Sequence, residues 1–309
     1  MTGQADGQFD VVVIGAGLVG LSTAMALLAA QPSLRVAVLE KEQAVGAHQS
    51  GHNSGVIHAG LYYKPGSLKA TFCREGRQAM IEFAQAHQIP YRLAGKLVVA
   101  THAGELGRLA GLADRGRANG LAVRELGPDE IAEIEPGVRG VRALHIPESG
   151  VIDYRLVAAA YAKVVTGHGG AVRCGHGVRG LVRERAGWAV TTGAGSRDMM
   201  DSLRFPGLRR LARAYAGTGA REIWRDLMKP AFLADMRRYV PAIRASDVRF
   251  GPSGIRAQCL SRSGVLVDDF LIEESAGIIH VLNAPSPAAT ASIVIGRHIA
   301  SRVAAHTGR

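Results

Sequence analysis

The sequence is short of cysteine, aromatic residues and lysine, and each shortage narrows the kinds of protein it can encode. The three cysteines among 309 residues, Cys73, Cys174 and Cys259, lie far apart and fit no metal-binding or redox spacing. We therefore expect reduced thiols in a cytoplasmic protein. Aromatic residues make up 5% of the chain, whereas hydrophobic residues make up 47% and glycine fills 39 positions. This composition is typical of an α/β protein with a large core.

Lysine is scarce, with 6 residues against 31 arginines, although the net charge is +11. The range Arg197–Arg262 alone holds 14 basic and 6 acidic residues. Such an excess suits a nucleic acid, an anionic membrane surface or an acidic substrate. Aromatic residues do not alternate with the basic ones as in single-strand binders, and we find no nucleic-acid-binding motif. We therefore expect no nucleic-acid partner.

Neither a membrane span nor a secretion signal is expected. Residues 11–30 form an uncharged run as long as a transmembrane helix. Three glycines interrupt it at the spacing of a nucleotide-binding loop, which favours that second interpretation. The ten residues before the run carry no basic side chain, so the start does not resemble a signal peptide.

The glycines Gly15, Gly17 and Gly20 follow a strand-like run over Phe9–Ile14 and open a helix-like stretch. In this pattern the first glycine makes a tight turn and the second lets the backbone approach a pyrophosphate. The third lets the helix pack closely on the strand. The free N–H groups at the helix start then attract phosphate. The segment predicts a Rossmann-like dinucleotide-binding unit.

A second strand-like run, Arg35–Leu39, ends in Glu40, where an acidic side chain would bind a ribose hydroxyl. A long loop rich in glycine, histidine, serine and asparagine then replaces the next crossover helix, over residues 41–70. A flavin needs such a segment because its ring extends beyond the pyrophosphate, so the loop favours FAD over NAD. Three histidines of the loop lie four and six residues apart, which fits no zinc pattern, and we expect no metal site.

Five segments of the chain strongly resemble L-2-hydroxyglutarate dehydrogenases and oxidases, in the D-amino-acid-oxidase-like superfamily of FAD enzymes. They are "NSGVIHAGLYYKPGSLKA" (53–70), "ELGPDEIAEIEP" (125–136), "IPESGVIDYRLVAAAYA" (146–162), "GIRAQCLSRSGVLVDDFLIEE" (254–274) and "IIHVLNAPSPAATASIVIGRHIA" (278–300). The resemblance implies an α/β fold, in which a Rossmann-like FAD-binding domain is interleaved with an α+β substrate domain.

The resemblance also implies an activity. A 2-hydroxy diacid would be oxidised to the 2-oxo acid by hydride transfer to flavin N5, while a base accepts the hydroxyl proton. The electrons would pass to a quinone of the respiratory chain or to oxygen, with the enzyme on the inner face of the cell membrane. A related amine or glycerol-phosphate oxidase and an inactive FAD-binding remnant are the alternatives.

The family's FAD-binding positions carry over to sixteen residues. We expect them to be Gly15, Gly17, Gly20, Glu40, Lys41, Ser50, Asn53, Ser54, Gly55, Val178, Asn283, Pro285, Ser286, Ala288, Ala289 and Thr290. Val178 would contact the adenine through its backbone. The segment Asn283–Thr290 would begin a helix whose positive end faces the flavin pyrimidine.

His58 is the candidate general base, because an imidazole titrates near working pH. The alternatives are a histidine that only bonds the backbone or stacks on the flavin, or one linked covalently to it. Arg256 is the candidate clamp for a substrate carboxylate, with a purely structural arginine as the alternative.

The remaining pattern predicts helices over 67–87, 105–119, 129–135 and 154–168, a strand over Tyr91–Ala100, and a hairpin over Val178–Thr192. We assign residues 1–90, 143–195 and 250–309 to the FAD-binding domain, and 91–142 and 196–249 to the substrate domain and a helical region. The basic stretch Leu203–Arg244 reads as amphipathic helices, which either pack on the substrate domain or dock on a membrane surface.

An internal piece expected from the family is missing between Thr192 and Leu203. Relatives return there to the nucleotide-binding sheet by a further strand and then build several antiparallel strands of the substrate sheet. This chain passes instead from the hairpin to a helix-like stretch within eleven residues, with the expected seam at Ser196–Arg197. A deletion in a decaying gene, a gene-model error and a shortened active variant all stay open.

Overall fold

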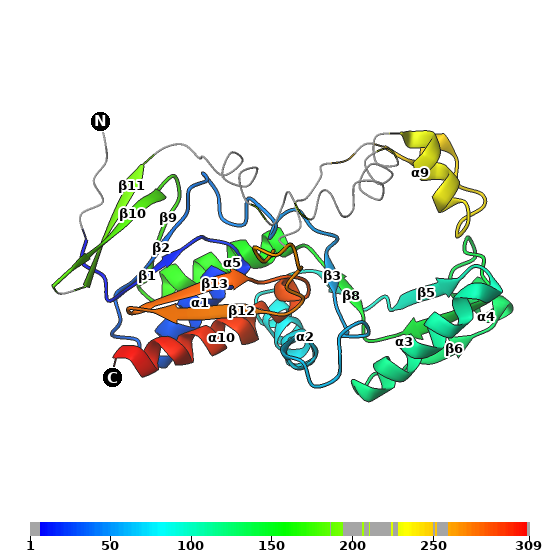
Figure 1. Ribbon diagram of the computed structural model, residues 1–309, viewed down its shortest axis with the longest axis horizontal. Helices are drawn as coiled ribbons and strands as arrows, with labels where there is room; N and C mark the ends of the chain where they lie inside the picture. The colour runs from blue at the N-terminus through cyan, green and yellow to red at the C-terminus, as the bar shows by residue number, and fades with distance from the viewer. Residues whose placement is uncertain are drawn as a thin grey trace.

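The computed structural model describes residues 7–185, 187–193, 206, 210, 224, 228–249, 251 and 259–307. Figure 1 shows two groups of elements side by side. A parallel sheet with α1, α5 and α10 forms one group, and an antiparallel sheet with α3 and α4 forms the other. The expected α/β class is confirmed. Among the described helices, none is both long and apolar enough to cross a membrane.

The parallel sheet contains β1 (Val11–Ile14), β2 (Val36–Leu39) and β9 (Ala171–Arg173), in the order β1-β2-β9. All four residues of β2 are buried. Such a continuous apolar run is what a parallel strand with neighbours on both sides needs. The glycine loop follows β1, and the predicted acidic residue follows β2, so both lie at the carboxyl edge of the sheet.

Three helices complete this group: α1 (Leu18–Ala30), α5 (Tyr154–Gly167) and α10 (Ala288–Thr307). Helix α1 packs against both of the others. Gly296 allows a close approach of α10, since a Cβ there would lie 2.5 Å from the backbone carbon of Ser22. The Ser22 hydroxyl donates to the Ser292 carbonyl over 2.7 Å. The last helix of the chain is thereby fixed beside the first.

Two three-stranded antiparallel sheets follow: the first lies between the two groups, and the second belongs to the group of α3 and α4. They are β3 (Val56–Ile57), β8 (Gly150–Ile152) and β4 (Tyr91–Arg92), in the order β3-β8-β4, and β5 (Lys96–Ala100), β7 (Arg142–Ile146) and β6 (Arg124–Leu126), in the order β5-β7-β6. Helices α3 (Leu106–Ala118) and α4 (Pro128–Ile134) bury Leu109, Ala113 and Ile131 against the second sheet. Helix α2 (Leu68–Ala86) packs along α10.

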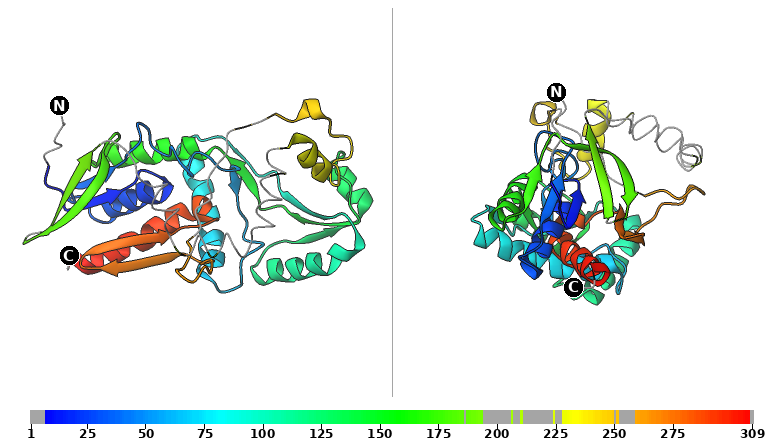
Figure 2. Two further views of the ribbon diagram at one scale, coloured as in Figure 1. Left: turned by 45° about the horizontal axis from the view of Figure 1, so that its top comes forward. Right: turned by 90° about the vertical axis from the view of Figure 1, so that its left-hand side faces the viewer.

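Two hairpins lie at the end of the molecule away from α3 and α4 (Figure 2). They are β10 (Gly177–Glu184) with β11 (Gly187–Gly193), and β12 (Leu271–Ser275) with β13 (Ile278–Asn283). Arg183 and Trp188 both donate from their side chains to the Ala276 carbonyl, so the first hairpin contacts the turn of the second. The other described elements are η1 (Ala103–Glu105), α9 (Lys229–Met236) and η2 (Ala245–Asp247).

Most of the expected elements are confirmed within one or two residues. The exception is the single strand predicted over Tyr91–Ala100, which is wrong. Gly95 has a φ of +70°, which interrupts an extended strand, so β4 and β5 pair in different sheets. The helical interpretation of Leu203–Arg244 falls largely outside the described residues, as does the seam at Ser196–Arg197. The division into domains stays a prediction.

Strand β1 lies at an edge of its sheet. In the described part of the chain it pairs with β2 alone, and Ile14 is 54% exposed. A doubly wound sheet has the order 3-2-1-4, in which the glycine-bearing strand is central. Here β9, β2 and β1 correspond to strands 3, 2 and 1. This edge is therefore where the strand that the sequence analysis expects to be missing would pair.

Candidate functional site

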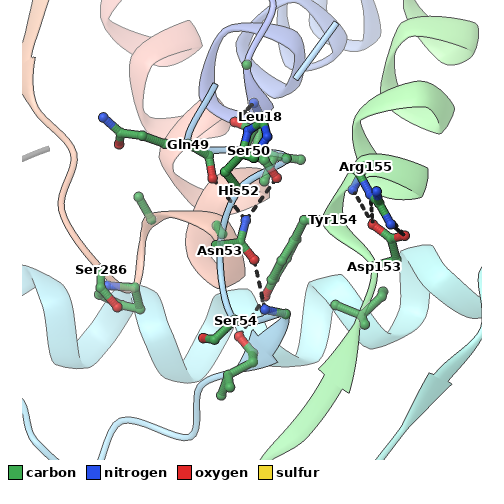
Figure 3. Close-up of a pocket in the computed structure, with 18 of the residues that line it drawn as sticks. Leu18, Gln49, Ser50, His52, Asn53, Ser54, Asp153, Tyr154, Arg155 and Ser286 are labelled. Carbon is green, nitrogen blue, oxygen red and sulfur yellow. Dashed lines mark hydrogen bonds and ion pairs between the residues drawn. The ribbon is translucent and has the colours of Figure 1, made fainter. Parts of the chain in front are cut away.

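A cleft of about 1150 Å³ lies between the glycine loop, the loop before β3, the ends of β4 and β8, and the start of α10 (Figure 3). It brings together ten of the sixteen expected cofactor residues, together with His58. The ten are Gly15, Gly17, Gly20, Ser50, Asn53, Ser54, Gly55, Ser286, Ala288 and Ala289. The volume is slightly above the range of roughly 300–1,000 Å³ that is usual for ligand pockets.

The glycine loop has the geometry that its spacing predicts. Gly15 has a φ of +100° and donates its N–H to the Leu39 carbonyl over 2.7 Å, which makes the turn out of β1. A Cβ at Gly20 would collide with the Gly15 carbonyl oxygen, so only glycine lets α1 begin this close to the strand. A Cβ at Gly17 would lie 3.0 Å from Ser50 Oγ, and both residues line the cleft.

Residues of the next loop hold the start of α1. Ser50 Oγ accepts the Leu18 N–H over 3.0 Å, and Glu40 Oε2 accepts the Ala16 N–H over 2.8 Å. A hydroxyl that accepts one bond keeps a proton to donate, so Ser50 can also bond an anion in the cleft. The first turn of α1 carries no acidic side chain that would compete with such an anion.

Three expected cofactor residues lie outside the lining of the cleft: Glu40, Lys41 and Val178. Glu40 is 9% exposed, and its second oxygen accepts the Glu42 N–H over 3.0 Å. Lys41 lies against Gly177, at the start of the strand that contains Val178. Carboxylate oxygens accept more than one bond, so the Glu40 side chain keeps capacity for a ribose hydroxyl.

Asn53 uses its side chain to fix the loop. Its Nδ2 donates to the Gln49 and Ser50 carbonyls over 3.0 and 2.9 Å, and its Oδ1 accepts the Gly55 N–H over 2.9 Å (Figure 3). A Cβ at Gly55 would lie 2.8 Å from the Ile152 carbonyl oxygen. These contacts set the path of the backbone that faces the cleft.

The expected helix start over Asn283–Thr290 needs correction. Asn283 ends β13, and α10 begins at Ala288, after a turn closed by the Ala288 N–H donating to the Pro285 carbonyl over 2.9 Å. Asn283 is 2% exposed and bonds the Cys259, Val267 and Asp269 backbone. Ser286, Ala288 and Ala289 face the cleft, so the start of α10 does border it.

The cleft is thus bordered by the N-terminal ends of two helices, α1 and α10. Each end presents backbone N–H groups and a partial positive charge. Between them the loop backbone approaches the cleft without large side chains. This arrangement fits a long ligand with a negative group at each of two places along its length.

His58 also lines the cleft, half-buried, with Nε2 3.3 Å from Ser286 Oγ. Arg256, the other catalytic candidate, lies outside the described residues. The sequence interpretation missed Arg92, Asp153 and Arg155, which line the same cleft. Hydrogen bonds from Arg155, the shortest 2.7 Å, hold the pKa of Asp153 below its usual range. Pairing of β8 with β3 and β4 brings these residues to the site, and nothing in the local sequence indicates that pairing.

The chain matches the family model described as FAD dependent oxidoreductase over residues 10–202. It is 33% identical to an L-2-hydroxyglutarate dehydrogenase of Indibacter alkaliphilus, covering 93% of this chain and 97% of the relative. The corresponding enzyme of Escherichia coli strain K12 is 32% identical, with 96% and 93% covered. The mitochondrial human enzyme is 31% identical, with 96% and 88% covered.

The first of these alignments runs over 386 positions, 77 more than the 309 residues of this chain. At least that many positions inside the matched region of the relative face no residue here. The length difference supports the expectation that an internal piece is missing.

Two solved structures have a similar fold. One is the L-alpha-glycerophosphate oxidase of Mycoplasma pneumoniae with FAD bound, at a TM-score of 0.57 and 26% identity. The other is the glycine oxidase of Geobacillus kaustophilus, at a TM-score of 0.55 and 23% identity. The matches cover 62% and 60% of this chain but only 51% of each of the two structures. The chain therefore spans about half of their length.

Proposed function

Because the chain belongs to the L-2-hydroxyglutarate dehydrogenase family of FAD-dependent oxidoreductases, we propose that it binds FAD in the described cleft and oxidises L-2-hydroxyglutarate. The product is the corresponding 2-oxo acid. The observation that carries this proposal is the cleft itself, in which the glycine loop, two helix starts and His58 come together from distant parts of the sequence.

Bound FAD supplies the acceptor for the hydride that leaves the hydroxyl-bearing carbon. Gly15, Gly17 and Ser50 would hold its pyrophosphate at the start of α1, and Glu40 would bind a ribose hydroxyl. Lys41 and Val178 would lie at the adenine, and the start of α10 would stabilise negative charge on the ring. The remaining expected positions, Asn53, Ser54, Gly55, Asn283, Pro285, Ser286, Ala288, Ala289 and Thr290, would line or support this path.

His58 would accept the hydroxyl proton of the substrate. A neutral imidazole has one nitrogen that accepts a hydrogen bond or a proton. The 3.3 Å contact between Nε2 and Ser286 Oγ is long and therefore weak, so a substrate hydroxyl can take the place of the serine. A guanidinium would bind a substrate carboxylate in a bidentate manner, for which Arg256 and Arg92 are the candidates. Within the described part of the chain, Arg92 forms no ion pair although it lines the cleft.

Substrate-dependent bleaching of the flavin tests this function. The purified chain is mixed without oxygen with L-2-hydroxyglutarate, and separately with glycerol 3-phosphate and with glycine. We expect loss of flavin absorbance with the 2-hydroxy acid alone. Bleaching by glycerol 3-phosphate or glycine instead would identify the chain as a related oxidase.

A second candidate function is FAD binding without turnover. It is favoured by the open edge of β1 and by the absence of at least 77 positions that the Indibacter relative has. A cofactor site needs a rigid surrounding shell for efficient chemistry. This candidate predicts a yellow protein whose absorbance no substrate changes.

We further propose that electrons pass to a quinone or to oxygen, and that the enzyme works in the cytoplasm at the membrane surface. The basic side chains near α9, Arg237, Arg238 and Arg244, support contact with anionic lipid. Co-sedimentation with anionic vesicles that is lost in high salt, and absent with neutral vesicles, is the expected outcome. Equal binding to both kinds of vesicle would contradict it.

A further inference from the structure

His58 contacts three side chains, one from α2, one from α10 and one from the turn before α10. Its backbone N–H donates to Thr290 Oγ1 of α10 over 3.0 Å. Its carbonyl accepts the Cys73 thiol of α2 over 3.2 Å. Its imidazole Nε2 contacts Ser286 Oγ over 3.3 Å. Burial raises the pKa of the Cys73 thiol to about 12, so this group stays protonated and keeps donating.

Thr290 is also part of a chain of hydroxyl groups beneath the cleft. Tyr154 Oη lies 2.9 Å from Thr290 Oγ1 and 3.0 Å from the Val56 carbonyl oxygen. Thr290 Oγ1 itself lies 3.3 Å from that carbonyl. The His58 N–H can only donate, and the Val56 carbonyl can only accept.

These constraints leave two orders of the protons, because either hydroxyl can donate in the contact between Tyr154 and Thr290. If the shorter contacts each contain a proton, His58 N–H donates to Thr290, Thr290 donates to Tyr154, and Tyr154 donates to the Val56 carbonyl. The two hydroxyls thus bridge the backbone on either side of Ile57, which is 0% exposed. They fix the extended backbone at the point where β3 ends and His58 enters the cleft.

Both hydroxyls belong to buried residues. Thr290 is 0% exposed and Tyr154 is 2% exposed. Burial also raises the pKa of Tyr154, so it remains a donor at any working pH. Removal of the Thr290 hydroxyl would leave the His58 N–H without this partner, and removal of the Tyr154 hydroxyl would leave the Val56 carbonyl only the longer 3.3 Å contact with Thr290. The backbone would relieve either loss by moving.

We propose that Thr290 and Tyr154 are positioning residues that hold the His58 imidazole in the cleft through the backbone of residues 56–58. This inference rests on the proposed function for the consequence in turnover, although the geometry itself does not. It also changes the expected role of Thr290, from a residue that binds FAD to one that acts through His58. Geometry errors of about 1 Å at a reacting group lower turnover by roughly 100-fold.

The test compares Thr290→Val, which keeps the shape and loses the hydroxyl, with Thr290→Ser, which keeps the hydroxyl. Tyr154→Phe removes the second hydroxyl. The matched control is Tyr161→Phe, because Tyr161 Oη bonds Ser292 Oγ over 3.0 Å between the same two helices and both residues are buried. Within the described part of the chain, the hydrogen bonds of this pair reach Ala289 and Ser22 and none of residues 56–58.

Two readouts are taken on the purified full chain. The first is the imidazole region of the nitrogen–proton NMR spectrum with labelled histidine, in which the His58 signal is the one lost in His58→Gln. We expect the signal to shift or broaden in Thr290→Val and Tyr154→Phe, and to be restored in Thr290→Ser and unchanged in Tyr161→Phe. The second is turnover, for which we expect kcat to fall about 10–100-fold with KM within about twofold.

An unmoved His58 signal in Thr290→Val would overturn the proposal, as would an equal shift in Tyr161→Phe. An equal fall of kcat in Thr290→Ser and Thr290→Val would also overturn it, since the hydroxyl would then be irrelevant. Failure of the proposed function can be told apart from failure of this inference. Full turnover in His58→Gln would show that His58 is not the base, while the NMR comparison would still decide whether Thr290 and Tyr154 position its imidazole.

Discussion

At the scale of single residues, the site depends on places where a side chain is absent. Gly20 brings α1 close to the Gly15 backbone, and Gly17 leaves room for the Ser50 hydroxyl. Ser50 then accepts the Leu18 N–H across 32 residues of sequence. The spacing of the glycines predicts their roles because each role is local. The Ser50 contact is not local, and only the resemblance to a family indicates it.

Gly20→Ala should destabilise the fold, because the new Cβ would collide with the Gly15 carbonyl oxygen. Overpacking of this kind costs roughly 1–3 kcal/mol. The control is Gly111→Ala on α3, where a Cβ would meet nothing within 4 Å. That change should stabilise the chain by about 0.5–1 kcal/mol, since alanine favours a helix. Urea unfolding measures both, and equal effects would show that the close contact at Gly20 does not matter.

At the scale of elements, the N-terminal ends of three helices lie at the cleft. The starts of α1 and α10 border it, and α5 begins beside it with Asp153 as its N-cap, which accepts the Arg155 N–H over 2.9 Å. The sequence predicts α5 within one residue, and the glycine spacing indicates the start of α1, which has no side-chain cap. It predicts the strand over 91–100 wrongly, because the local pattern does not register the turn at Gly95.

Asp153→Ala should lower the free energy of unfolding by about 0.5–2 kcal/mol, whereas Asp153→Asn should cost less because asparagine also caps helices. The Arg155 hydrogen bonds lower the pKa of Asp153, so its ionic contribution is present above the unfolded pKa of about 3.9. That contribution is lost as the pH falls through the lower folded value. The stability advantage of the native chain over Asp153→Asn should therefore shrink below about pH 4. An advantage that stays constant down to acid pH would contradict this cause.

At the scale of the whole molecule, a cleft that gathers ten of the expected cofactor residues lies beside a parallel sheet in which β1, within the described residues, is an edge strand. The nucleotide-binding unit and its glycine loop follow from sequence pattern alone. The link from α10 and α5 to His58 does not, since Thr290 and Tyr154 lie 136 residues apart and meet only in the fold. The expectation of a missing strand fits the short connection in the sequence and, within the described residues, the edge position of β1.

The open edge should make the chain self-associate. Unpaired strand edges are templates for pairing with another chain, and a lysine on the edge prevents this. We expect Ile14→Lys to reduce the concentration-dependent mass seen by analytical ultracentrifugation. Val182→Lys is the control, because Val182 is a similarly exposed apolar residue, 57% against 54%, on the β10 hairpin. Equal reduction by both would locate the association elsewhere.

The central claim is that the cleft holds FAD and presents L-2-hydroxyglutarate to it despite the missing piece. The visible absorbance of the purified chain, recorded without oxygen before and after addition of L-2-hydroxyglutarate, tests this most directly. The account predicts a bound flavin spectrum that bleaches with the substrate and returns when an electron acceptor is added. A colourless protein that does not take up added FAD, or a flavin spectrum that the substrate leaves unchanged, would contradict it.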